Sequence, residues 1–99
     1  MAKPPIGTIQ KRDNYICQYC GKDGLESLVN WHDSTVDHFR PRKYGGTDDS
    51  ENLVTSCGHC NSIKGDLLFG SLEECKVYIL KRRAELQITF EAVKKAVRG

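Results

Sequence analysis

The 99-residue sequence lacks any apolar run long enough to cross a membrane as a helix. Its first residues, Met1 to Pro5, include two prolines and a lysine and lack the apolar core of a secretory signal peptide. Internal repeats and low-complexity segments are also missing. We therefore expect one domain spanning residues 1–99, without a membrane segment, in the reducing cytoplasm.

A large net charge is missing as well, since the formal charge is only +2 at pH 7. That value alone does not identify a polyanionic partner. The charges are unevenly distributed along the chain. Residues 1–22 carry four Lys or Arg against one Asp, and residues 71–99 carry seven Lys or Arg against four Glu. Basic ends can bind phosphates on both sides of a central site. For the C-terminal charges alone, a solvated helix face explains the pattern equally well.

Cysteine is abundant for so short a chain, whose small core needs a further source of stability. Two Cys-x-x-Cys pairs, Cys17/Cys20 and Cys57/Cys60, are separated by thirty-six residues. This spacing lets four thiolates approach one tetrahedral ion at about 2.3 Å, which is typical of a closed structural zinc site. A dithiol redox pair and an iron-sulfur centre are the alternatives. The odd fifth cysteine, Cys75, also favours metal over disulfides.

Two other cysteine chemistries fit the pattern poorly. A zinc deaminase needs His-x-Glu upstream of Pro-Cys-x-x-Cys, and neither is present. A thioredoxin-like protein needs only one Cys-x-x-Cys, in a βαβ setting. Because all four thiolates would be ligands, the zinc would have no open position for chemistry. We expect it to hold the two cysteine turns together, so that its loss unfolds the domain.

Turn signals and periodicity predict a series of short elements. The sequence favours a short helix over 6–12, an extended segment over 28–31, strands over 35–38 and 53–55 with a mobile loop over 42–51 between them, and a helix over 61–64 that Gly65 ends.

The C-terminal third predicts a long amphipathic helix over 71–98, or two helices joined near 87–89. Ser71 and Glu74 form a capping box at its start. An apolar stripe follows at steps of three or four, with Arg83 as its only break, and is expected to pack on the core: Leu72, Cys75, Ile79, Leu86, Phe90, Val93 and Val97.

Asp37 and His38 stand near the end of the first predicted strand. Hydrolysis of a phosphodiester requires an activated water, a group that takes its proton, and positive charge on the phosphate. His38 is the natural base, because a neutral imidazole is available near pH 7. Neighbouring strand residues point to opposite faces, so the pair can serve one substrate only if the strand ends or bends there. Pro41 favours such an end.

A second, catalytic ion is expected beside this base. Asp37 and Asn61 supply hard oxygen ligands of the kind that Mg²⁺ or Mn²⁺ prefers. Asn61 directly follows Cys60, so the zinc site would fix where this ligand emerges. Lys64 lies three residues further on, on nearly the same helix face, where it could contact phosphate.

Taken in order, these motifs resemble the HNH endonuclease family of the ββα-metal fold, in its four-cysteine zinc-binding form. The resemblance covers about residues 12–66 and is carried by Cys-x-x-Cys, Asp37-His38-x-x-Pro41, Gly45-Gly46, Asn52-Leu53 and Cys57-x-x-Cys60-Asn61-x-x-Lys64-Gly65. It implies an α+β fold: a small ββα-metal core with a structural zinc site, flanked by an N-terminal helix and the C-terminal helical segment.

The resemblance also implies roles for single residues. His38 matches the general base, and Asp37 the acid that binds the metal. Asn52 matches the residue that ties down the loop and orients the base through its backbone. Asn61 stands where many members carry histidine, and its oxygen favours Mg²⁺ or Mn²⁺ over softer ions. The family leaves 3′-hydroxyl and 5′-phosphate ends.

The expected function is a metal-dependent DNA endonuclease, in a bacterial or phage-infected cell as is frequent for small members of this family. A catalytically silent zinc module that binds nucleic acid or protein is the alternative, and a thiol redox protein is a third. Arg40, Arg42 and Lys43 flank the base and contact phosphate or lie in a solvated loop. No recognition module accompanies the core, so specificity is low or comes from a homodimer or a partner protein.

Overall fold

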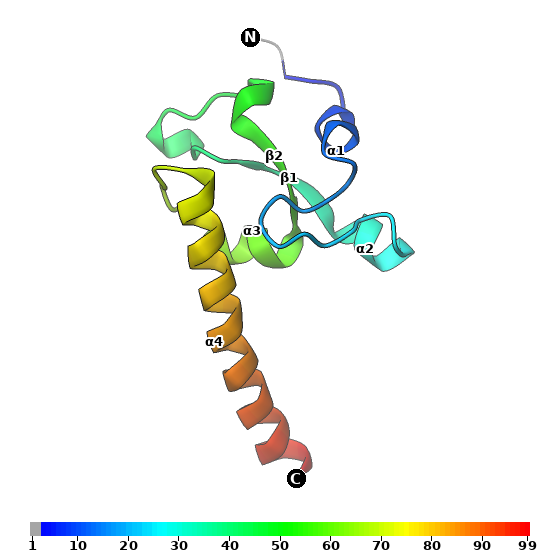
Figure 1. Ribbon diagram of the computed structural model, residues 1–99, viewed down its shortest axis with the longest axis vertical. Helices are drawn as coiled ribbons and strands as arrows, with labels where there is room; N and C mark the ends of the chain where they lie inside the picture. Colours follow the sequence, from blue (N-terminus) through cyan, green and yellow to red (C-terminus); the bar gives the residue numbers. More distant parts are fainter. Residues whose placement is uncertain (1–2) are drawn as a thin grey trace.

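A two-stranded antiparallel hairpin stands at the centre of the molecule (Figure 1). In this computed structural model, which describes residues 3–99, β1 (Ser34–His38) pairs with β2 (Leu53–Cys57). Asp37 lies opposite Val54, and His38 lies opposite Leu53. The two predicted strands are confirmed, and the predicted α+β fold class with them. Met1 and Ala2, the first residues of the N-terminal segment before α1, lie outside the described residues.

The predicted N-terminal helix is present as α1 (Thr8–Arg12) and is fastened to β2. Arg12 Nη2 donates to the carbonyl of Leu53 at 2.7 Å, and the backbone N–H of Thr55 donates to Asp13 Oδ2 at 3.0 Å. Because these bonds join residues about forty positions apart, they fix the first cysteine turn, which follows α1, next to the hairpin.

The extended segment predicted over 28–31 is wrong. These residues belong to a helix, α2 (Leu28–Asp33), whose first turn is capped by Ser27. The Ser27 hydroxyl accepts a hydrogen bond from the backbone N–H of Asn30 at 3.1 Å. Leu28 and Val29 favoured an extended segment, but both are exposed, so the local cap decides the conformation.

The short helix after the second cysteine pair is confirmed as α3 (Gly58–Lys64), although it begins three residues earlier than predicted. The Cys57 sulfur accepts from the backbone N–H of Cys60 at 3.4 Å, so the cysteine turn is itself the first turn of the helix. Gly65 ends it with a φ of 54°, as predicted.

The C-terminal segment forms one continuous helix, α4 (Leu72–Arg98), that extends away from the rest of the domain (Figure 1). The Ser71 hydroxyl accepts from the Glu74 N–H at 3.1 Å, while the Glu74 carboxylate accepts from the N–H of Gly70 rather than of Ser71. No helix among residues 3–99 is both long and apolar enough to cross a membrane.

The predicted packing of the apolar stripe holds only for the first part of α4. Cys75 and Ile79 are fully buried. They join a core that is otherwise built from the two cysteine turns and Tyr19. The stripe residues Phe90, Val93 and Val97 are more than half exposed, because α4 has passed the end of the domain.

The segment between the strands, predicted as a mobile loop, contains two single turns of 3-10 helix, η1 (Arg42–Tyr44) and η2 (Ser50–Asn52). Gly46 lies directly against the backbone of Arg40, where a Cβ atom would collide with the carbonyl oxygen. This close approach requires glycine and holds the loop against the residue that follows His38 and Phe39.

Candidate active site and metal centre

The four predicted zinc ligands converge. The sulfur atoms of Cys17, Cys20, Cys57 and Cys60 all lie within 4.8 Å of one another. Four thiolates at about 2.3 Å from a tetrahedral ion would lie about 3.8 Å apart, and the Cys20 and Cys57 sulfurs are 3.8 Å apart. All five cysteines are free thiols, and Cys75 is buried outside this cluster. The cluster therefore has the composition and size of a four-thiolate zinc site.

Two polar contacts outside the cluster support it. Asp33 Oδ2 accepts from the backbone N–H of Gly58 at 3.1 Å and from Lys22 at 3.0 Å, which joins α2 to the start of α3. Arg83 Nη1, on α4, lies 3.3 Å from the Cys60 sulfur. The residue that interrupts the apolar stripe is thus the one that reaches the cysteine cluster, and this interruption was the signal in the sequence that could have identified it.

Asp37 lies at the buried face of β1, 7% exposed. Its Oδ2 accepts a hydrogen bond from the Tyr19 hydroxyl at 2.6 Å and lies 3.1 Å from Lys64 Nζ. Burial, followed by the bond to Asp37, raises the pKa of Tyr19 well above its usual range. Tyr19 stands between Cys17 and Cys20, and nothing in its sequence context predicted this contact.

One oxygen of the same carboxylate stays available. Asp37 Oδ1 makes no hydrogen bond within residues 3–99. The one side-chain polar atom that is buried without a partner in this part of the chain is Ser34 Oγ, so Asp37 Oδ1 is in contact with solvent. Asp37 can therefore offer an oxygen to a cation, although the Lys64 charge nearby opposes cation binding.

Lys64 is not placed as expected for a phosphate contact. Its side chain is completely buried, and its ammonium group bonds the His38 carbonyl at 3.2 Å besides pairing with Asp37. A buried, paired ammonium cannot reach a phosphate without leaving the core. Lys64 joins the last turn of α3 to the end of β1, so from inside the core it fixes the position of one element relative to the other.

His38, the predicted base, is half-buried at the last position of β1, on the face opposite Asp37. Its Nε2 lies 2.7 Å from Asp48 Oδ1, and Arg42 Nη2 donates to that same oxygen at 2.9 Å. Arg42 was a candidate from the sequence, whereas Asp48 was assigned no role there. The hydrogen bond with His38, followed by the Arg42 charge, lowers the pKa of Asp48.

Asn52 ties the loop to the residues after the base, as the resemblance implied. Its side-chain oxygen accepts from the N–H of Arg40 at 2.8 Å, while its amide donates to the carbonyls of Arg40 at 3.1 Å and Thr47 at 2.9 Å. Its backbone carbonyl accepts from the N–H of Phe39 at 2.9 Å. The amide thus closes the loop at both ends.

The remaining candidates lie around this centre. Arg40 donates through Nε to the Tyr44 carbonyl at 2.6 Å, and Lys43 pairs with Asp66 at 3.0 Å. Both side chains lie at the surface. Asn61 is half-buried on α3, one turn before Lys64, and its side chain makes no hydrogen bond in the described chain. His59, which lies between Cys57 and Cys60 in the sequence, is exposed.

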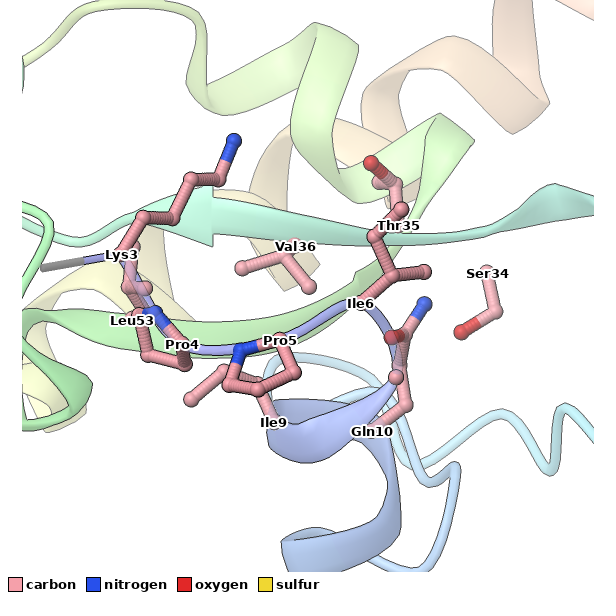
Figure 2. A pocket seen from close by; sticks show the side chains of 11 residues that line it. Lys3, Pro4, Pro5, Ile6, Ile9, Gln10, Ser34, Thr35, Val36 and Leu53 are labelled. Carbon is pink, nitrogen blue, oxygen red and sulfur yellow. The ribbon is translucent and has the colours of Figure 1, made fainter.

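The predicted centre lies outside the pocket beside the N-terminal segment. That pocket, of 340 Å³, runs between the N-terminal segment and β1, with Pro5, Ile9, Val36 and Leu53 on its walls (Figure 2). None of the residues predicted for catalysis lines it. A shallower pocket of 230 Å³ is lined by Arg40, Thr47 and Asn52. Two of the candidate site residues, Arg40 and Asn52, therefore line a pocket at the surface.

A family model described as HNH endonuclease matches residues 17–67, just over half of the chain. The chain belongs to the HNH endonuclease family. The match begins at Cys17, the first cysteine of the cluster, and ends after α3, so it contains the hairpin, both cysteine turns and the loop that Asn52 closes.

One curated relative is named a CRISPR-associated endonuclease Cas9, from Corynebacterium diphtheriae. It is 40% identical over 60 residues, which are 60% of this chain and 5% of the relative. The chain thus spans about a twentieth of that protein's length. No solved structure matches the chain.

Proposed function

We propose that this protein is a metal-dependent DNA endonuclease. The observation that carries the proposal is the placement of Asp37 and His38 at the end of β1, next to the loop that Asn52 closes and beside the last turn of α3. Membership of the HNH family and the likeness to an enzyme named endonuclease support the reaction class.

In the proposed reaction, His38 takes a proton from a water molecule, and the resulting hydroxide attacks the phosphorus of DNA. Asp37 Oδ1 and the Asn61 amide oxygen would hold one Mg²⁺ or Mn²⁺ ion, which supplies positive charge for the phosphate and the leaving oxygen. Asn52 keeps the backbone around the base in place through its bonds to Arg40 and Thr47.

The thiolate cluster would bind zinc with a structural role only. Four thiolates leave no open position, and three of them are buried. The zinc would hold α3, with Asn61 and Lys64, against the hairpin. Arg42, Arg40 and Lys43 lie at the surface beside His38 and are proposed to contact phosphate. The proposed setting is the reducing cytoplasm of a bacterial or phage-infected cell, where thiolates stay available to zinc.

A catalytically silent module that binds nucleic acid is the second candidate. The buried Lys64–Asp37 pair favours it, because a cationic group already neutralises the proposed metal ligand. A homodimer or a partner protein that supplies sequence specificity is compatible with both candidates and remains a proposal.

Incubation of supercoiled plasmid with the zinc-loaded protein and Mg²⁺ or Mn²⁺ separates the two candidates. The enzyme nicks or linearises plasmid, and a weak chelator stops this reversibly without unfolding the domain. His38→Ala abolishes cutting, while the matched control His32→Ala, on α2, cuts as the parent does. DNA binding without cutting under all metals supports the silent module. Equal cutting by His38→Ala and the parent removes His38 from the mechanism.

A further inference from the structure

We infer that the outer part of α4 binds the same part of a second copy of this chain, as a pair of antiparallel helices. The contact surface is the outer stripe of α4, which consists of Leu86, Phe90, Val93 and Val97. The inference does not rest on the proposed function, because the association of two chains can be measured without DNA.

The outer stripe continues the face of α4 that the domain covers. Cys75 and Ile79 lie on this face and are fully buried. Further along the helix, Phe90 and Val93 are each 55% exposed, and Val97 is 75% exposed. The same row of side chains therefore loses its cover where α4 passes the end of the domain (Figure 1).

The outer part of α4 needs a packing surface to be stable. Residues 87–98 make roughly three turns of helix, and every one of them is exposed. A helical segment of this length is marginal in water, because most helical stability in proteins comes from the packing of an apolar face. A partner that buries the outer stripe would supply this packing.

The spacing of the outer stripe suits a second helix. Its residues follow one another at steps of four, three and four, which is the heptad spacing of paired helices. An antiparallel alignment sets Leu86 opposite Val97 of the second copy and Phe90 opposite Val93. Each larger side chain then faces a smaller one, which favours close packing along the seam. The contact is the same on both chains, so it closes as a dimer.

The charges of α4 select the antiparallel orientation and an identical partner. Residues 85–91 carry two Glu and no Lys or Arg, whereas residues 92–98 carry two Lys and one Arg and no acidic residue. In the antiparallel pair the acidic half of each helix lies beside the basic half of the other, and Glu91 comes close to Lys94 of the second copy. A parallel pair would bring the two basic halves together, which is unfavourable.

Sedimentation of the zinc-loaded, full-length chain over a concentration series tests the association. We expect a reversible dimer with a dissociation constant in the micromolar range, because the seam is short. Phe90→Glu should raise this constant by about 100-fold or more, since the dimer would bury two unpaired carboxylates. Ile88→Glu is the matched control: Ile88 is 73% exposed on the opposite face of the same part of α4, so this variant should dimerise as the parent does.

A second measurement tests the orientation of the two helices. A mixture of isotope-labelled and unlabelled protein gives nuclear Overhauser signals between the two chains alone. We expect such a signal between the methyl groups of Leu86 in one chain and Val97 in the other. Within a single helix these two residues are roughly 16 Å apart along the axis, which is too far for a signal of their own.

A monomer at every protein concentration up to about 1 mM overturns the inference. Equal dissociation constants for Phe90→Glu and Ile88→Glu overturn it as well, because the outer stripe would then not be the contact surface. A dimer whose signals join Val97 of one chain to Val97 of the other is parallel and contradicts the proposed arrangement. If the protein dimerises as expected but does not cut DNA, the proposed function fails and the inference stands.

Discussion

Lys64 and Asp37 form an ion pair inside the protein, with Nζ and Oδ2 3.1 Å apart and the lysine side chain fully buried. The pair joins the last turn of α3 to the end of β1, and the same ammonium group bonds the His38 carbonyl at 3.2 Å. Removing one partner of a buried pair leaves the other charge unpaired, which is strongly unfavourable. The position of the candidate base therefore depends on a lysine that does not face solvent.

Lys64→Met should lower the free energy of unfolding by about 3–5 kcal/mol, since the Asp37 charge then stays buried without its cation. Urea denaturation of the zinc-loaded protein measures this. Lys43→Met is the control, because Lys43 pairs with Asp66 at the surface and its removal should have no measurable effect. Unchanged stability of Lys64→Met, combined with weaker DNA binding, would instead assign Lys64 to phosphate.

The hydroxyl of Tyr19 predicts how stability depends on alkaline pH. Burial and the bond to Asp37 raise its pKa, so the folded protein keeps this proton while an unfolded tyrosine loses it near pH 10. Above that pH the unfolded state binds fewer protons than the folded state. Stability is therefore full below about pH 10 and falls as the pH rises further.

Two measurements check this. Tyrosinate absorbance of the folded parent should show one of its four tyrosines still protonated after the others have ionised. Tyr19→Phe should lose both that late step and the alkaline fall in stability that Tyr19 causes, whereas Tyr44→Phe, at an exposed position, should keep both. An alkaline stability profile that is the same in Tyr19→Phe and the parent contradicts the assignment.

The contact of Arg83 with Cys60 predicts a role in zinc retention. A four-thiolate zinc site carries a net negative charge, which a guanidinium 3.3 Å from one sulfur offsets. Arg83→Gln should release zinc faster to a strong chelator, by about 10-fold or more. Arg82→Gln, on the exposed side of the same helix, is the control and should match the parent. Equal release rates for both variants would make the Arg83 contact incidental.

The parts of the structure that local chemistry controls could be predicted from the sequence. Two Cys-x-x-Cys pairs were enough to place four thiolates together, and Pro41 and Gly65 marked the ends of β1 and α3 correctly. In the same way, Asn52 was expected to close the loop after the base, and it does so through three hydrogen bonds.

Contacts between distant elements could not be predicted in this way. Lys64 shares a motif with Asn61, and its burial depends on Tyr19 and Asp37, which come from two other segments. The stripe on α4 repeats regularly beyond Arg83, yet periodicity does not say where the domain surface ends. Leu28 and Val29 of α2 were misleading for a similar reason, because the apolar character of a residue does not show whether it lies at the domain surface.

The central claim is that a divalent ion binds between the end of β1 and α3. Titration of the zinc-loaded protein with Mn²⁺, followed by paramagnetic broadening of its backbone amide signals, tests this most directly. The account predicts that the signals of Asp37, His38 and Asn61 broaden first and that Asp37→Asn abolishes the effect. Broadening centred instead on Asp48 and Asp49, or no localised broadening at all, would contradict it.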